Sequence, residues 1–194
     1  MENFLLDLVV DQNSRGMSPE VIAHHHCPWR HTVREFVNGI PVWRAWSFGQ
    51  LVYAPIAPTF GLHLRRITAS SKPAIIHLHL PNLSCFWALL LPRRIPLVIQ
   101  WQSDVVRSQF DERLSLLYPF YRVAEKRLLQ RSQAIITSSD NYLNGSSTLS
   151  EFKHKCVTIP LGLDGGRIHR PSRESVTSTK RKFSRCLVMS AGRF

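Results

Sequence analysis

Long apolar runs and acidic residues are both scarce in this 194-residue chain. No apolar run approaches the roughly 18 residues that a membrane-spanning helix needs. The start, Met1–Phe4, lacks the basic stretch and cleavage pattern of a signal peptide. We therefore expect a cytoplasmic protein without a membrane span, able to work at the inner face of the membrane.

Paired cysteines are also lacking. The four cysteines lie far apart and form no Cys-x-x-Cys pair: Cys27, Cys85, Cys156 and Cys186. This spacing favours free, buried thiols over a disulfide framework, and thus a reducing cytosol. The run His24–Cys27 has no second cluster at a zinc-site spacing, so a solvated loop is favoured over a metal site and no metal is expected. Gly-x-Gly-x-x-Gly, P-loop and Gly-x-Ser-x-Gly patterns are absent too.

Positive charge is abundant and unevenly placed. The chain has 25 basic and 13 acidic residues, a net charge of +12, and seven of the basic residues lie between Arg167 and Arg185 beside a single acid. Residues 165–185 are polar, and a solvated linker is the favoured interpretation. Attraction to anionic lipid headgroups or to nucleic acid is the alternative, with nucleic acid the less favoured partner. The linker divides a first domain, residues 1–164, from residues 186–194, which resume as the first strand of a second domain.

Strands and helices alternate regularly from residue 74 onward. The strands lack polar alternation, which is typical of a parallel sheet with both faces covered. The expected order is strand 74–78, helix 83–91, strand 97–101, helix 114–130, strand 134–137, helix 140–149 and strand 156–159. We therefore predict an α/β fold, a Rossmann-like, doubly wound parallel sheet.

Over the first seventy residues, the sequence predicts helices and strands of the same domain that alternate less regularly. An amphipathic helix is expected over 2–13, and a further helix between residues 58 and 67. Three short strands are expected over 19–23, 32–36 and 42–46, the last two joined through the tight-turn pair Asn38-Gly39.

Polar side chains gather where two predicted strands end. His77, His79 and Asn82 accompany the first strand of the regular part, and Gln102-Ser103-Asp104 follow the second. Ligands of open α/β sheets bind at the carboxyl ends of the strands. Neutral imidazoles at that edge can donate or accept hydrogen bonds to sugar hydroxyls, whereas one or both histidines can instead be structural. Asp104 can bind a hydroxyl or cap the following segment.

Several segments, in this order, resemble the amino-terminal half of glycosyltransferase family 4, the retaining enzymes of the GT-B fold. The matching segments are Ile76–Asn82, Trp101–Val106, Leu117–Pro119, Ala134–Ser139, Val157–Asp164 and Ser190–Phe194. Members of this family begin with a strand and a Gly-Gly loop that precede the helix seen here at residue 2. The resemblance therefore implies that the first strand is missing and that the sequence is truncated at both ends.

The resemblance implies transfer of a hexose from a nucleoside diphosphate sugar to a glycan or lipid-linked acceptor in cell-surface polysaccharide synthesis. The nucleotide sugar would be a co-substrate, with no permanently bound cofactor. The amino-terminal half of such an enzyme holds the acceptor, so His77, His79, Asn82, Gln102, Ser103 and Asp104 are the expected acceptor-binding residues. Asp104 and Gln102 are the candidates for a catalytic role.

One departure from the family pattern leaves a second function open. The family usually has His-Ser-Asp where this chain has Gln102-Ser103-Asp104, and glutamine cannot act as an acid or base at neutral pH. Together with the lack of donor-domain residues, this favours a chain that does not catalyse transfer alone. The alternative is a non-enzymatic binding or partner subunit that keeps the acceptor-domain fold.

Overall fold

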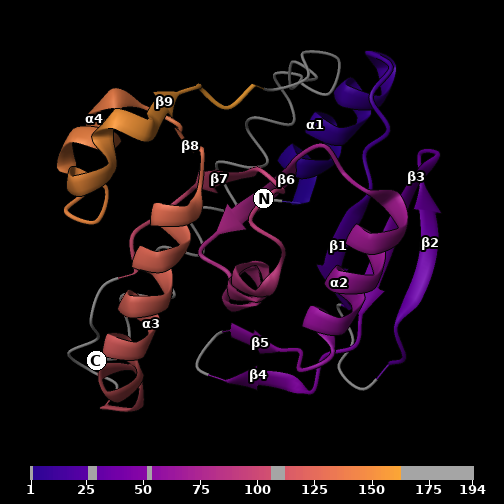
Figure 1. The fold of residues 1–194 in the computed structure, drawn as a ribbon, viewed down its shortest axis with the longest axis horizontal. Helices are drawn as coiled ribbons and strands as arrows, with labels where there is room; N and C mark the ends of the chain where they lie inside the picture. The colour runs from indigo at the N-terminus through magenta and orange to yellow at the C-terminus, as the bar shows by residue number, and fades with distance from the viewer. Residues whose placement is uncertain (1, 26–29, 52–53, 106–111, 163–194) are drawn as a thin grey trace, which may run out of the picture. The chain divides into compact units, whose positions relative to one another are not determined.

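A computed structural model describes residues 2–25, 30–51, 54–105 and 112–162. The chain divides into two compact units, Met1–Leu161 and Gly162–Phe194. All helices and strands described below belong to the first unit (Figure 1). The predicted linker at 165–185 and the predicted strand at 186–194 lie outside the described residues.

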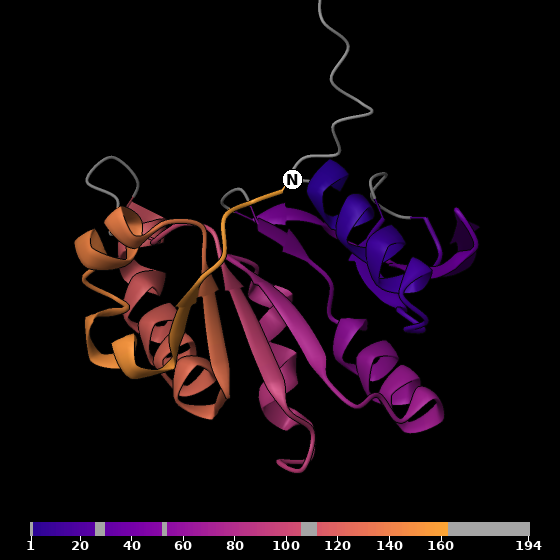
Figure 2. The same ribbon diagram turned by 90° about the horizontal axis from the view of Figure 1, so that it is seen from above.

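A four-stranded parallel sheet forms the larger half of the first unit (Figure 2). Its strands are β6 (Ile76–Leu80), β7 (Leu97–Trp101), β8 (Ala134–Thr137) and β9 (Cys156–Thr158), and they pair in that order. Strand β7 has Leu97, Ile99 and Trp101 buried, as expected of an apolar strand whose sheet is covered. The α/β, Rossmann-like prediction is confirmed.

Helical segments connect these parallel strands. They are the 3₁₀ helix η1 (Leu83–Leu90), α3 (Glu112–Arg131), α4 (Asp140–Gly145) and the 3₁₀ helix η2 (Ser150–Lys155). Helix α3 packs against η1, and the Phe86 and Tyr121 rings meet edge to face with centroids 5.3 Å apart. Tight packing of connecting helices keeps the strand ends, where ligands bind, in a fixed arrangement.

The first seventy residues form helix α1 (Glu2–Ser14) and a smaller, mixed sheet. In this sheet β1 (Val21–His24) pairs in parallel with β3 (Ile40–Ala45), which pairs in turn with the antiparallel β2 (Val33–Val37). The turn between β2 and β3 places Asn38 at φ 51° and Gly39 at φ 78°. These are the left-handed conformations of a two-residue hairpin turn, so the predicted Asn38-Gly39 hairpin is confirmed.

A short hairpin follows, made of β4 (Gly49–Leu51) and β5 (Ala54–Ile56), and leads into α2 (Phe60–Ser71). The sequence analysis did not predict this hairpin, because strands of three residues carry too little periodicity to detect. Among the described residues, β1 pairs only with β3 and β6 only with β7, so the parallel strands lie in two sheets.

Most boundaries differ from prediction by a few residues, and three differences bear on the site. Strand β6 covers 76–80 instead of 74–78, so His77 and His79 both lie inside the strand. The segment 83–91, expected as an α-helix, is the 3₁₀ helix η1. The helix expected over 140–149 ends at Gly145 and is followed by a separate 3₁₀ turn from Ser150. Tertiary pairing decides these ends, and a single sequence shows only the apolar run around them.

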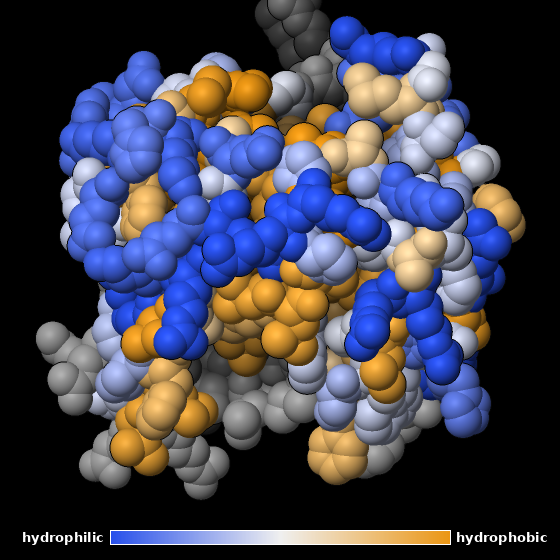
Figure 3. Space-filling view, viewed as in Figure 1, coloured by the Kyte–Doolittle hydropathy of each residue, from blue (hydrophilic) through white to orange (hydrophobic). Residues whose placement is uncertain are grey.

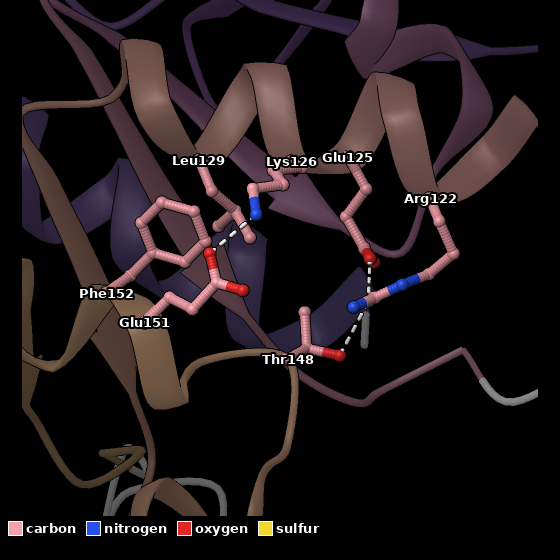
Figure 4. Close-up of a pocket in the computed structure, with 7 residues that line it drawn as sticks. All are labelled: Arg122, Glu125, Lys126, Leu129, Thr148, Glu151 and Phe152. Carbon is pink, nitrogen blue, oxygen red and sulfur yellow. Dashed lines mark hydrogen bonds and ion pairs between the residues drawn. The ribbon is translucent and has the colours of Figure 1, made fainter. Parts of the chain in front are cut away.

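A cluster of polar residues joins α3 to η2 and the segment before it (Figure 4). The Glu125 side chain is 1% exposed and is paired with Arg122, whose guanidinium also donates to Thr148 Oγ1 at 2.7 Å. Burial is the main reason that the pKa of Glu125 is raised, and the Arg122 charge opposes it. On the surface beside this pair, Lys126 and Glu151 lie 2.6 Å apart. The contacts are internal to the protein, so this cluster is structural.

None of the helices in the described part of the chain is long and apolar enough to cross a membrane.

Candidate functional site

Two of the predicted site residues meet where β6 and β7 end. The backbone N–H of Gln102 donates to Leu80 O at 3.0 Å, which extends the pairing of the two strands by one residue. This bond brings the Gln102 side chain beside β6, with its Nε2 3.4 Å from His79 Nδ1. The close approach is a consequence of parallel register, since His79 and Gln100 are directly paired.

The imidazoles of His77 and His79 lie on one face of β6, two residues apart. Their ring centroids are 4.7 Å apart, and the His79 ring also meets Phe4 of α1 at 6.5 Å. Burial lowers the pKa of His77 and lowers that of His79 to about 4, where the neighbouring His77 adds to the effect. Both rings are therefore neutral at pH 7.

Asn82 lies just after the cis Leu80–Pro81 peptide bond and connects β6 to β1. Its Oδ1 accepts a hydrogen bond from Ser84 N at 3.0 Å, which caps η1, and lies 3.4 Å from His24 Nε2. The His24 ring stacks on Phe60 with centroids 5.1 Å apart. Burial lowers the pKa of His24, and the hydrogen bond that His24 Nε2 donates to Asn82 Oδ1 opposes this effect.

His24 was placed in a solvated loop by sequence reasoning, and that prediction was wrong. It is the last residue of β1, half-buried, and its side chain reaches the turn after β6. The next residue, His25, is buried. Residues 26–29, including Cys27, lie outside the described residues. The missed signal was position: His24 follows the apolar strand residues 21–23 just as His79 follows Leu78, so both stand near strand ends.

We call His24, His77, His79, Asn82 and Gln102 the imidazole–amide cluster. Within the described structure, three of its buried polar atoms have no hydrogen-bond partner: His24 Nδ1, His77 Nε2 and Gln102 Oε1. Buried polar atoms are almost always satisfied in folded proteins, and unsatisfied ones mark places where a ligand or water is needed. All five side chains are uncharged near neutral pH, so the cluster suits a neutral, hydroxyl-bearing ligand.

The other two predicted site residues have different surroundings. Ser103 is exposed. Asp104 is half-buried, and its carboxylate accepts hydrogen bonds from Trp101 Nε1 at 2.9 Å, Tyr142 OH at 2.9 Å and Ser146 Oγ at 2.8 Å. Burial and the bond to Asp104 raise the pKa of the Tyr142 hydroxyl. The structure thus brings His77, His79, Asn82 and Gln102 together and directs the Asp104 carboxylate to α4 and the residue after it.

No group of three or more His, Cys, Asp or Glu side chains suited to a metal occurs in the described part of the chain. Cys85 is a buried free thiol whose pKa burial raises to about 12, and Cys156 is a half-buried free thiol. Neither thiol is ionised near neutral pH, so neither serves as a nucleophile there.

A sequence profile described as Glycosyl transferase 4-like domain matches residues 1–162. The chain belongs to this glycosyltransferase 4-like family. It is also similar to the O-antigen chain mannosyltransferase C of Escherichia coli, with 33% identity over 67 residues. That alignment covers 34% of this chain and 16% of the relative, so the chain spans a small part of the relative's length.

In this glycosyltransferase 4-like domain, the matched region contains every described helix and strand and the whole imidazole–amide cluster. Four of its residues, His24, His79, Asn82 and Gln102, lie at or just beyond the carboxyl ends of parallel strands, the general ligand-binding edge of open α/β sheets.

Proposed function

We propose that this domain is the acceptor-binding part of a retaining GT-B glycosyltransferase. The reaction would transfer a hexose from a nucleoside diphosphate sugar to a glycan or lipid-linked acceptor during synthesis of a cell-surface polysaccharide, at the cytoplasmic side of the membrane. The imidazole–amide cluster carries the proposal, because it offers uncharged donors and acceptors at a strand edge. The family match and the relative's role as an O-antigen chain mannosyltransferase support it.

Each polar residue has a definite part in this proposal. His77 and His79, both neutral, exchange hydrogen bonds with acceptor hydroxyls, and the Gln102 amide orients His79 while its free Oε1 accepts from the sugar. Asn82 fixes the turn through Ser84 N, and exposed Ser103 is free to meet the acceptor. Asp104 acts by holding the loop, since its oxygens already accept from three protein groups. The nucleotide sugar enters as a co-substrate and is not retained.

Binding of a glycan by the full chain tests the proposal directly. Mannose-containing oligosaccharides, titrated while histidine ring resonances are observed by NMR, should shift the His77 and His79 signals. Gln102→Ala should weaken binding about three- to tenfold, the effect of losing one or two neutral hydrogen bonds. Gln130→Ala, on an exposed position of α3, is the matched control and should bind as the native chain does. Equal glycan affinities of the two variants would show that the imidazole–amide cluster is not part of the acceptor site.

A non-enzymatic binding subunit is the second candidate, and Gln102 is the observation that favours it. An amide beside His79 cannot take up or release a proton near neutral pH, so acid–base work at this position is excluded. Incubation of the full chain with nucleotide sugars carrying a radioactive hexose, together with oligosaccharide acceptors, tests this second candidate. Labelled product would exclude a non-enzymatic subunit, whereas glycan binding without product agrees with a binding subunit and with an acceptor-binding part that lacks its donor domain.

A further inference from the structure

Helix α3 presents an apolar stripe to the solvent. Leu116, Phe120 and Val123 are spaced four and three residues apart, so they share one face of the helix. They are 74%, 72% and 51% exposed, and Leu117 beside them is 45% exposed. A solvated helix normally carries polar residues on this face, so three large apolar side chains in a row indicate a surface that is covered in use.

Exposed arginines lie next to the apolar stripe. Arg127 follows Val123 by four residues on the same face and is exposed. Arg93 and Arg94, directly after η1, are also exposed. They lie near the end of α3, since Arg131 donates to Pro92 O at 2.9 Å, and burial together with the Arg93 charge lowers the pKa of Arg131.

Acidic residues are few in the segments that form this surface. Residues 81–103, which include η1, contain no Asp or Glu. Between Ser115 and Arg131, Glu125 is the single acidic residue, and its side chain is buried against Arg122. The exposed face of α3 is therefore apolar in its first half and cationic in its second half, where the exposed Glu151 of η2 pairs with Lys126 and leaves Arg127 without an acidic partner among the described residues.

Figure 3 shows the apolar surface over the lower part of α3 and a second apolar area over η1, with hydrophilic surface between and beside them. Leu90 of η1 contributes to the apolar character, since it is 75% exposed. We define the α3–η1 surface by Leu90, Arg93, Leu116, Phe120, Val123 and Arg127.

We propose that the α3–η1 surface docks this protein onto an anionic lipid bilayer. Exposed aromatic and aliphatic side chains enter the boundary between headgroups and acyl chains, and the arginines beside them meet lipid phosphates. Charge complementarity chooses the lipid over a second copy of the chain, because two such surfaces would bring cations against cations on a protein of net charge +12. The proposal does not depend on sugar transfer, because α3 is separate from the imidazole–amide cluster.

Co-sedimentation of the full chain with vesicles tests this surface. Vesicles of phosphatidylcholine alone are compared with vesicles in which about 30% is phosphatidylglycerol, at low salt and at about 1 M salt, where exposed charges are screened. We expect binding to the anionic vesicles at low salt, and binding weakened at least tenfold at high salt or without phosphatidylglycerol.

Two matched pairs of variants locate the contact. Phe120→Asp should weaken vesicle binding about tenfold or more, because it removes an aromatic side chain that is exposed in the free protein and enters the bilayer on binding. Phe36→Asp, at a comparably exposed phenylalanine of β2, should not. The double variant Arg93→Glu/Arg127→Glu should weaken it at least tenfold, whereas Arg65→Glu/Arg66→Glu, with the same change in net charge on α2, should have a much smaller effect. Circular dichroism of each variant checks that it is folded.

Three results would overturn the proposal. The first is absence of binding to anionic vesicles by the native chain. The second is equal loss of binding in the two members of a pair, which would mean that net charge or general surface apolarity decides. The third is a native dimer, seen by sedimentation velocity, that Phe120→Asp converts to monomer while vesicle binding is kept, which would assign the stripe to a second copy of the chain.

Discussion

Burial keeps the His77 and His79 rings uncharged at neutral pH. A buried ring loses hydration when it takes up a proton, and at His79 the adjacent His77 would add repulsion between like charges. Both effects act against the imidazolium form, so these rings offer one donor and one acceptor each. That is the hydrogen-bonding capacity that a sugar hydroxyl matches.

The same burial predicts that acid destabilises the protein. In the unfolded state His79 takes up a proton below its ordinary pKa of about 6.5, whereas in the folded state it does so only below its lowered pKa of about 4. Stability from this residue is thus complete above about pH 6.5 and is lost progressively down to about pH 4. We expect the free energy of unfolding in urea to fall by about 1–2 kcal/mol between pH 7 and pH 5.

Substitution of single histidines tests which residue causes this dependence of the unfolding free energy on pH. His79→Gln should flatten the fall of the unfolding free energy between pH 7 and pH 5, whereas His154→Gln, which removes an exposed ring, should leave it unchanged. An undiminished slope in His79→Gln would mean that other groups carry the acid sensitivity.

Helix α2 packs closely against η1 at Gly61. A Cβ atom added at Gly61, in the first turn of α2, would lie 2.6 Å from Cε3 and 2.7 Å from Cδ2 of the Trp87 ring. Alanine normally favours a helix over glycine by about 1 kcal/mol, but here the clash reverses the sign. We expect Gly61→Ala to lower the unfolding free energy by about 1–2 kcal/mol. Gly145→Ala, with nothing within 4 Å of its added Cβ, should be neutral or slightly stabilising, and similar losses in both variants would contradict this account.

The loop after β7 is tied to α4 through Asp104. Its carboxylate accepts from Trp101, Tyr142 and Ser146, so Asp104→Asn places an N–H₂ group against donors. We expect a loss of about 1–3 kcal/mol of unfolding free energy, measured by urea denaturation. Asp11→Asn, which breaks an exposed pair with Arg15, should cost less than about 1 kcal/mol. Equal effects would show that the Asp104 bonds add no more than a surface ion pair does.

Sequence periodicity predicted elements where the apolar run itself decides the structure. Strand β7 was predicted with its observed bounds, because the apolar residues Leu97–Ile99 and Trp101 lie between Pro96 and the polar run that starts at Gln102. The ends of β6 and α4 were missed because strand pairing and the contacts of Ser146 set them. In the site, the sequence predicted that Gln102 and His79 lie close together, because they stand near the ends of two neighbouring strands. The sequence did not predict the position of His24 beside Asn82, because that position depends on how the smaller sheet lies against the parallel sheet.

At the scale of the whole first unit, the most completely buried apolar side chains gather in the parallel sheet and the helix that covers it. Leu97, Ile99 and Trp101 of β7 are at most 1% exposed, and Leu128 and Leu129 of α3 are fully buried. The smaller sheet has Ile40 and Ala45 buried on β3, while its edge strand β2 has Val33 and Phe36 exposed. Regions with more buried apolar contacts open less often, so the two sheets should differ in local stability.

Hydrogen exchange followed by mass spectrometry should show this difference. Amides of 97–101, which pair with strands on both sides, should exchange last, and amides of the edge strand 33–37 should exchange at least tenfold faster. Ile99→Ala removes a fully buried side chain and should lower the unfolding free energy by about 2–5 kcal/mol. If the parallel sheet opens as one cooperative unit, this variant accelerates exchange in 97–101 and 134–137 alike. Protection of 33–37 equal to that of 97–101 would instead mean that the two sheets open together, and that the core of the parallel sheet does not set the order of unfolding.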